Sequence, residues 1–159
     1  MEPFSNNIVF IDTEFSDLNP YHGEILSIAL VKPDGQELYL ELEYDGPVSD
    51  WVRENIVPTL TAPKVPREEA KRKIKEFLGG KKPYAIGFVN QYDTLYIYKL
   101  FRGDEDPFYW MPIDFASILF GNGKNPEASI MEYPKDKYRE HNALDDARFL
   151  RDNYLKFFQ

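Results

Sequence analysis

The sequence contains no cysteine and only two histidines, His22 and His141. The absence of cysteine excludes disulfide bonds, thiolate zinc sites and cysteine nucleophiles, and two histidines limit any imidazole metal site to two such ligands. No stretch approaches the roughly 18 consecutive apolar residues that a membrane span requires, and the first residues, MEPFSNN, show neither a basic start nor an apolar signal core. We therefore expect no membrane association and a cytoplasmic location.

Basic residues are scarce relative to acidic ones. The chain has 19 lysines and arginines against 27 aspartates and glutamates, which gives a net charge of −8. This balance argues against a protein that coats nucleic acid through many phosphate contacts, because those contacts depend on lysine and arginine. It does not exclude a protein that handles the end of a nucleic acid, since metal ions can neutralise such a site locally.

The composition is that of a globular protein, with 43% apolar and 16% aromatic residues, and residues 1–159 are expected to form a single domain. No internal repeat, low-complexity stretch or linker divides the chain. Hydrophobic patterns predict strands at residues 8–12, 24–31, 36–43, 83–89 and 111–117. They predict helices at residues 49–57, 67–80, 91–101 and 142–158. This order predicts an α/β fold, a mixed sheet with helices packed on it.

Two carboxylates end the first predicted strand, in the stretch VFIDTEF at residues 9–15. Side chains at positions i and i+2 of a strand point to the same face, so Asp12 and Glu14 project together, roughly 7 Å apart along the strand. Two unpaired carboxylates would repel each other there, and a divalent cation between them would relieve the repulsion. The alternative is a solvated strand end whose acids cap neighbouring amides.

A third carboxylate, Asp93, falls in the first turn of the helix that follows the fourth strand. The helix dipole favours a carboxylate there, so capping alone also explains it. On the last helix, the apolar residues gather on one side of a helical wheel, and Asp146 lies at the edge of that side. Asp145 points nearly opposite and is expected to be solvated. His141 lies five residues before Asp146; its alternative interpretation is an ordinary surface histidine.

Three stretches, IVFIDTEF, GFVNQYD and HNALDDA, resemble in order and spacing the three motifs of the DEDDh 3′–5′ exonucleases. That family carries Asp-x-Glu on the first strand, an Asp at a helix start midway, and His-x4-Asp on the last helix. The DEDDy branch has a tyrosine four residues before the last Asp, where this chain has Asn142. The matching positions are Asp12, Glu14, Asp93, His141 and Asp146.

The resemblance implies a ribonuclease H-like fold with a mixed five-stranded sheet and helices on both faces. It implies that the four carboxylates hold two divalent cations, Mg²⁺ or Mn²⁺, and that His141 is the general base. The product would be a nucleoside 5′-monophosphate released from a 3′ end. Asp12, Glu14, Asp93, Asp146 and His141 are the implied catalytic residues.

A narrower likeness, carried by DTEF and by WVRENIVPTL at residues 51–60, is to small stand-alone exoribonucleases of the actinobacterial type. It favours single-stranded RNA or an RNA 3′ overhang as substrate, leaves DNA open, and implies a homodimer by analogy. Proofreading subunits often continue Asp-x-Glu with Thr-Thr-Gly, whereas this chain continues with Phe15, Ser16 and Asp17, which argues against proofreading. Near the site, the candidate substrate-binding residues are Thr13, Phe15 and Tyr92.

Further phosphate contacts are a hypothesis for six basic residues in and around the predicted helix 67–80, and a solvated helix face is the alternative. These residues are Lys64, Arg67, Lys71, Lys75, Lys81 and Lys82. Two rival functions also remain at this point: a non-catalytic binding module with the same fold, and a ribonuclease H-like endonuclease. The endonuclease chemistry also uses clustered acids, but it does not require a histidine five residues before the last aspartate.

Overall fold

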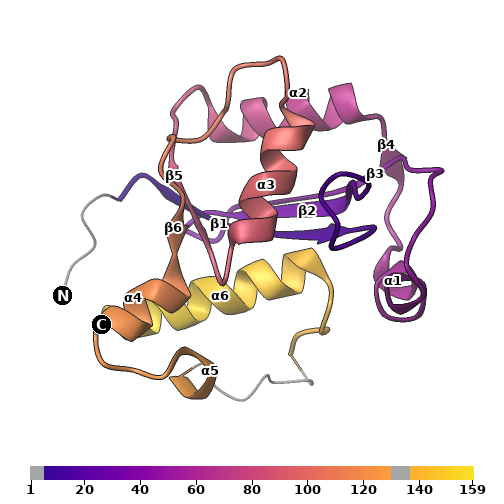
Figure 1. Ribbon diagram of the computed structural model, residues 1–159. Coiled ribbons are helices and arrows are strands. Elements are labelled where there is room, and N and C mark those ends of the chain that lie inside the picture. The colour runs from indigo at the N-terminus through magenta and orange to yellow at the C-terminus, as the bar shows by residue number, and fades with distance from the viewer. Residues whose placement is uncertain (1–5, 130–136) are drawn as a thin grey trace.

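A mixed sheet of six strands lies at the centre of the computed structural model, which describes residues 6–129 and 137–159 (Figure 1). The order across the sheet is β4-β3-β2-β1-β5-β6. β2 runs antiparallel to both β1 and β3, while β5 runs parallel to β1 and β6 parallel to β5. The strands are β1 Ile8–Phe15, β2 Ile25–Val31, β3 Glu37–Leu42, β4 Lys64–Val65, β5 Tyr84–Gly87 and β6 Ile113–Asp114.

Helices cover both faces of this sheet (Figure 1): α2 and α3 lie on one face, and α4 and α6 lie on the other. No helix in the described part of the chain has the length and apolar character needed to cross a membrane. The helices are α1 Asp50–Asn55, α2 Arg67–Leu78, α3 Gln91–Leu100, α4 Phe115–Gly121, α5 Pro126–Ser129 and α6 Ala143–Phe157, with a 3₁₀ turn, η1, at Val57–Thr59.

The central strand β1 is buried on both faces, which explains its almost unbroken apolar sequence. Val9 and Ile11 pack in the core shared with α2 and α3, whereas Ile8 and Phe10 pack in the core shared with α4 and α6. Because side chains alternate along a strand, the residues beyond Ile11 continue this pattern. The end of β1 therefore sends polar side chains towards two different helices, α6 and α3.

The predicted fold class is confirmed, but the predicted count of five strands is wrong by one. The extra strand, β4, has only two residues and pairs in parallel with β3, so it is too short to show any alternation of its own. The strand predicted over 111–117 is also only two residues long, and α4 takes up its second half. Asp114 causes this change, because its carboxylate accepts hydrogen bonds from Ala116 N and Ser117 N and so caps α4.

Candidate active site

The end of β1 opens into a pocket of about 540 Å³. Its walls come from β1, from α1, and from the first turns of α3 and α6, elements that lie far apart in the sequence. All eight residues that the sequence predicts for the site line this pocket: Asp12, Thr13, Glu14, Phe15, Tyr92, Asp93, His141 and Asp146. The structure therefore brings the three sequence motifs together in one place.

Three of the carboxylates form a compact group. Asp12 and Glu14 share the face of β1 that is turned towards α6, and Asp146 lies in the first turn of α6. One carboxylate oxygen from each of the three lies within 4.8 Å of those of the other two. Oxygens on opposite sides of one Mg²⁺ ion are about 4.2 Å apart, given Mg–O distances of about 2.1 Å. Small side-chain rotations would thus let the three acids ligate a common cation.

Asp93 approaches the same pocket from the other side of β1. Its Oδ1 accepts hydrogen bonds from Thr13 N at 2.8 Å and from Thr13 Oγ1 at 2.7 Å. This contact arises because β5 runs parallel to β1, with Phe10 opposite Ile86, so that the start of α3 reaches the end of β1. Among the described residues, Asp93 is not part of the three-carboxylate group. Thr13 therefore orients this carboxylate, and its predicted contact with substrate stays a prediction.

Burial and the charges of neighbouring acids both disfavour the ionised forms of the carboxylates in this pocket. Burial, followed by the charges of Asp93, Asp146 and Glu14, raises the pKa of Asp12 well above its ordinary value. Burial and the charges of Asp146 and Asp93 raise the pKa of Glu14 to about 8. Burial also raises the pKa of Asp93 to about 6, although the hydrogen bonds from Thr13 oppose the shift. A bound divalent cation would stabilise the ionised form of all these groups.

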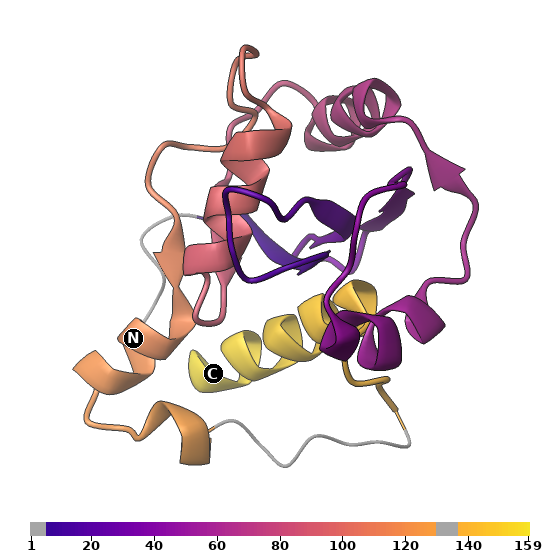
Figure 2. The ribbon, with the colours of Figure 1, turned by 45° about the vertical axis from the view of Figure 1, so that its right-hand side comes forward.

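His141 lies at the exposed rim of the pocket, just before α6. Its imidazole contacts the indole of Trp51 edge to face, with ring centroids 5.1 Å apart. Its carbonyl oxygen accepts a hydrogen bond from Thr59 Oγ1 at 2.8 Å. Figure 2 shows α1 next to the beginning of α6, in agreement with both contacts. The segment Trp51–Thr59 therefore borders the histidine that the sequence predicts as the base.

The aromatic side chains predicted to bind substrate are packed against one another. Phe15 stacks on Tyr96 with a centroid distance of 4.6 Å and an interplanar angle of 16°. It also lies 5.7 Å from the ring of Tyr92. Phe15 thus joins the α3 side of the core while it borders the pocket, and its role as a stacking surface for a base stays a prediction.

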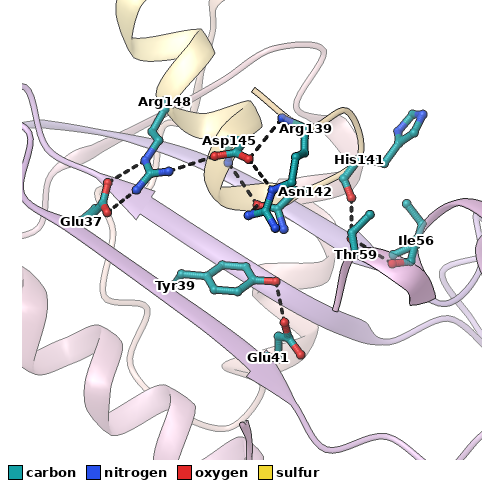
Figure 3. A network of polar contacts seen from close by, with 10 residues as sticks. All are labelled: Glu37, Tyr39, Glu41, Ile56, Thr59, Arg139, His141, Asn142, Asp145 and Arg148. Carbon is teal, nitrogen blue, oxygen red and sulfur yellow. Dashed lines mark hydrogen bonds and ion pairs between the residues drawn. The ribbon is translucent and has the colours of Figure 1, made fainter. Parts of the chain in front are cut away.

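The prediction that Asp145 is solvated is wrong. The residue is buried, with 5% of its surface exposed. It accepts hydrogen bonds from Arg139 Nε at 2.8 Å and from Arg148 Nη1 at 2.9 Å, as Figure 3 shows. The helical wheel places Asp145 away from the apolar side of α6 as predicted, but residues 137–142 fold over that position and cover it.

The basic residues in and around α2 are largely engaged within the protein. Lys71 lies 2.8 Å from Glu68 and 2.9 Å from Asp104, and Lys82 lies 2.7 Å from Glu105. Arg67 and Lys75 also form ion pairs. Four of the six basic residues predicted to contact phosphate therefore have acidic neighbours. This favours the alternative interpretation, in which these residues form a solvated helix face.

Several apolar residues that border the acids could not be predicted from the sequence. Leu18, Trp51 and Val89 remain largely exposed, although they line the pocket. α1 is only six residues long, too short for periodicity to separate Trp51 from its buried neighbour Val52. Val89 has a φ of 54°, which is rare for a β-branched residue, and no sequence signal indicates it. The remaining apolar lining residues are Val52 and Ile56.

No protein-family model and no curated protein sequence matches the chain. Solved structures do match. An Exonuclease I from Methylocaldum szegediense is 18% identical, with a TM-score of 0.69, and the match covers 96% of this chain and 40% of that one. E. coli Exonuclease I in complex with a dA16 oligonucleotide is 14% identical, with a TM-score of 0.70, and the match covers 96% of this chain and 41% of that one.

A third similar structure is the zinc-ion-bound form of the E. coli Exonuclease I complex with single-stranded DNA, at 13% identity and a TM-score of 0.68 over 96% of this chain and 40% of that one. These likenesses show that the chain has the ribonuclease H-like fold of these exonucleases. The chain spans about two fifths of the length of the solved structures it matches.

Proposed function

We propose that the protein is a metal-dependent 3′–5′ exonuclease that releases nucleoside 5′-monophosphates from single-stranded 3′ ends. The observation that carries this proposal is the convergence of Asp12, Glu14 and Asp146 in one pocket, within 4.8 Å of one another. Asp93 and His141 line the same pocket. A non-catalytic module needs neither this repulsive cluster nor a histidine at its rim.

The donor set fits hard divalent cations. The grouped ligand atoms are carboxylate oxygens, the ligands that Mg²⁺ and Mn²⁺ prefer. Asp12, Glu14 and Asp146 would hold the cations. Asp93, which Thr13 orients through two hydrogen bonds, would be a further ligand. When bound, a pair of such ions supplies an activated water and neutralises the charge that develops on the phosphate and on the leaving oxygen.

His141 has the role of proton acceptor in this proposal. The oxygen of the attacking water forms a bond to the phosphorus of the last phosphodiester, and the proton of that water passes to the imidazole. The bond from phosphorus to the 3′ oxygen of the preceding nucleotide breaks, and that oxygen takes up a proton from solvent. The rim position of His141 leaves its ring accessible from the pocket and from solvent.

The dimensions and charge of the site support a short substrate segment. A pocket of about 540 Å³ has room for one or two terminal nucleotides rather than a duplex. RNA is our preferred substrate, because the narrower sequence likeness is to small exoribonucleases. DNA is the second candidate, because similar structures contain single-stranded DNA oligonucleotides. A homodimer stays a prediction.

Digestion of 5′-labelled single-stranded RNA and DNA of the same sequence tests the proposal, with Mg²⁺, with Mn²⁺ and with EDTA. We expect a ladder that shortens from the 3′ end only when a divalent cation is present. Asp12→Ala and His141→Ala should abolish the ladder, while Asp34→Asn, in the turn between β2 and β3, should leave it unchanged. Internal cuts would instead identify an endonuclease, and a folded protein that cleaves neither polymer would refute the proposal.

A further inference from the structure

The backbone of His141 adopts a left-handed conformation, which is uncommon for residues other than glycine. Its φ is 58°, in the left-handed region, where the Cβ of a residue other than glycine crowds the following carbonyl oxygen. Such a conformation persists only when surrounding contacts impose it. Two sets of contacts hold His141 in this way, one from its own turn and one from a distant segment.

The first set closes the turn that leads into α6. Asp145 accepts hydrogen bonds from Arg139 N at 3.2 Å and from Arg139 Nε at 2.8 Å. Asn142, the N-cap residue of α6, accepts a hydrogen bond from Asp145 N at 3.3 Å. Figure 3 shows His141 at the end of this turn, with its ring directed away from the Arg139–Asp145 cluster and its carbonyl directed towards Thr59.

The second contact comes from residues more than eighty positions earlier in the chain. Thr59 Oγ1 lies 2.8 Å from the carbonyl oxygen of His141 and 2.9 Å from that of Ile56, so its single proton bridges the two segments. Thr59 ends the 3₁₀ turn η1, and Ile56, fully buried, anchors this region to the sheet through the small core that it shares with Leu26 and Val52.

The segment after Thr59 is also fixed to the sheet. Glu41 of β3, with only 1% of its surface exposed, accepts hydrogen bonds from Thr61 N at 2.7 Å and Ala62 N at 2.8 Å. Because this segment is anchored to the sheet, the hydroxyl of Thr59 can hold the backbone of the exposed His141 in a fixed position. Trp51, from the same region, contacts the imidazole itself.

We propose that Thr59 is a positioning residue for His141: its hydroxyl fixes the left-handed turn and thereby places the imidazole at the rim of the acidic pocket. This inference rests on the proposed function, in which His141 accepts the proton. Thr59 does not contact the reacting atoms. A loss of this anchor should therefore reduce the rate of the chemical step more than the binding of substrate.

Kinetics provide the first test. Thr59→Val keeps the size and β-branching and removes the hydroxyl, Thr59→Ala removes it with less bulk, and Thr59→Ser retains it. Thr61→Val is the matched control, because Thr61 is exposed and bonds to Glu41 through its backbone N–H rather than through its hydroxyl. We expect roughly a tenfold loss of kcat with unchanged KM in Thr59→Val and Thr59→Ala, since displacements near 1 Å cost up to about a hundredfold. Thr59→Ser and Thr61→Val should retain kcat.

A double-mutant cycle separates positioning from a general structural role. If Thr59 acts through the imidazole, Thr59→Val should cause no further loss when it is added to His141→Asn. A loss of equal size in that background would overturn the proposal, and so would an effect on KM alone. Thermal unfolding of each variant identifies any change that only reflects stability.

A structural readout needs no activity. The chain has only two histidines, so His22→Asn and His141→Asn assign both imidazole signals in a ¹H–¹³C NMR spectrum. Because the Trp51 ring lies 5.1 Å from that of His141, we expect the His141 signal to move in Thr59→Val but not in Thr61→Val. An unmoved signal refutes the inference. If the wild-type protein cleaves no nucleic acid, the proposed function fails, and this spectrum alone decides whether Thr59 places the ring.

Discussion

In the absence of divalent cations, the acidic pocket should make the protein less stable as pH rises, and Glu14 should carry much of this effect. The folded protein holds the Glu14 proton more tightly than the unfolded chain does, because burial and the neighbouring Asp146 and Asp93 raise its pKa from 4.5 to about 8. Stability from this group is therefore fully present below the ordinary pKa and is lost as pH rises through about 8.

The size of the effect follows from the two pKa values of Glu14. Between pH 6 and pH 8 the unfolded carboxyl is already ionised, whereas the folded one gives up its proton only near the upper limit. Integration of proton binding over this window gives a loss of ~2 kcal/mol from Glu14 alone. For a chain of this length, that corresponds to a fall in Tm of roughly 4–8 °C.

Thermal unfolding in EDTA at pH 6, 7 and 8 measures this loss, with Glu14→Gln as the variant that cannot ionise at this position. We expect the wild-type Tm to fall more steeply with pH than that of Glu14→Gln. At pH 8, millimolar Mn²⁺ should raise the wild-type Tm by several degrees, because the cation binds the folded, ionised cluster. It should raise the Tm of Glu14→Gln much less.

Parallel pH profiles for the two proteins would refute the reasoning, because they would mean that the folded protein does not raise the pKa of Glu14. An equal shift with Mn²⁺ would show that the cation binds elsewhere. Asp34→Asn is a useful reference for both measurements, because Asp34 lies in an exposed turn outside the pocket and should behave as the wild type does.

Three further outcomes follow from the site. His141→Asn should lower kcat by about 10²–10⁴-fold while the Mn²⁺-induced rise in Tm is retained; a loss of that rise would make His141 a ligand. Asp145→Asn should lower the free energy of unfolding by about 2 kcal/mol in a urea titration, since it weakens the buried bonds to Arg139 and Arg148; an unchanged urea midpoint would contradict the structure. Binding of a single-stranded oligonucleotide to a catalytically inactive variant should depend weakly on salt, with a slope shallower than about −2 in log–log form; a steep slope would indicate a basic surface that the ion pairs of α2 do not account for.

The elements with long patterns could be predicted from the sequence. The continuous apolar run of β1, the alternation of β3 and the amphipathic helices α2 and α6 all appear close to their predicted places. Gly79 ends α2 in the left-handed conformation, with a φ of 64°. The short elements β4, α4 and α5 could not be predicted, because tertiary contacts and single capping residues define them rather than periodicity.

The convergence of three acids could be predicted for a related reason. The period of a strand alone places Asp12 and Glu14 on one face, and the period of a helix alone places Asp146 at the edge of the apolar side. Both predictions hold in the structure, where the three acids meet. The helical wheel does not predict the burial of Asp145, because that burial comes from another segment. The turn at residues 139–142 covers the side chain, and the periodicity of α6 contains no information about this turn.

The position of Asp93 in the pocket depends on the topology of the sheet, and the periodicity of a single strand or helix cannot predict that topology. Because β5 pairs in parallel with β1, the two strands end at the same edge of the sheet, and the helix after β5 begins beside Thr13. Alternation then sends Thr13 to the α3 side and its neighbours Asp12 and Glu14 to the α6 side. The polar end of β1 thus contacts residues of two helices, α3 on one face of the sheet and α6 on the other. This one strand therefore brings the acids of both helices to the same pocket. An antiparallel β5 would place Asp93 at the opposite edge, and the same sequence motifs would then build no site.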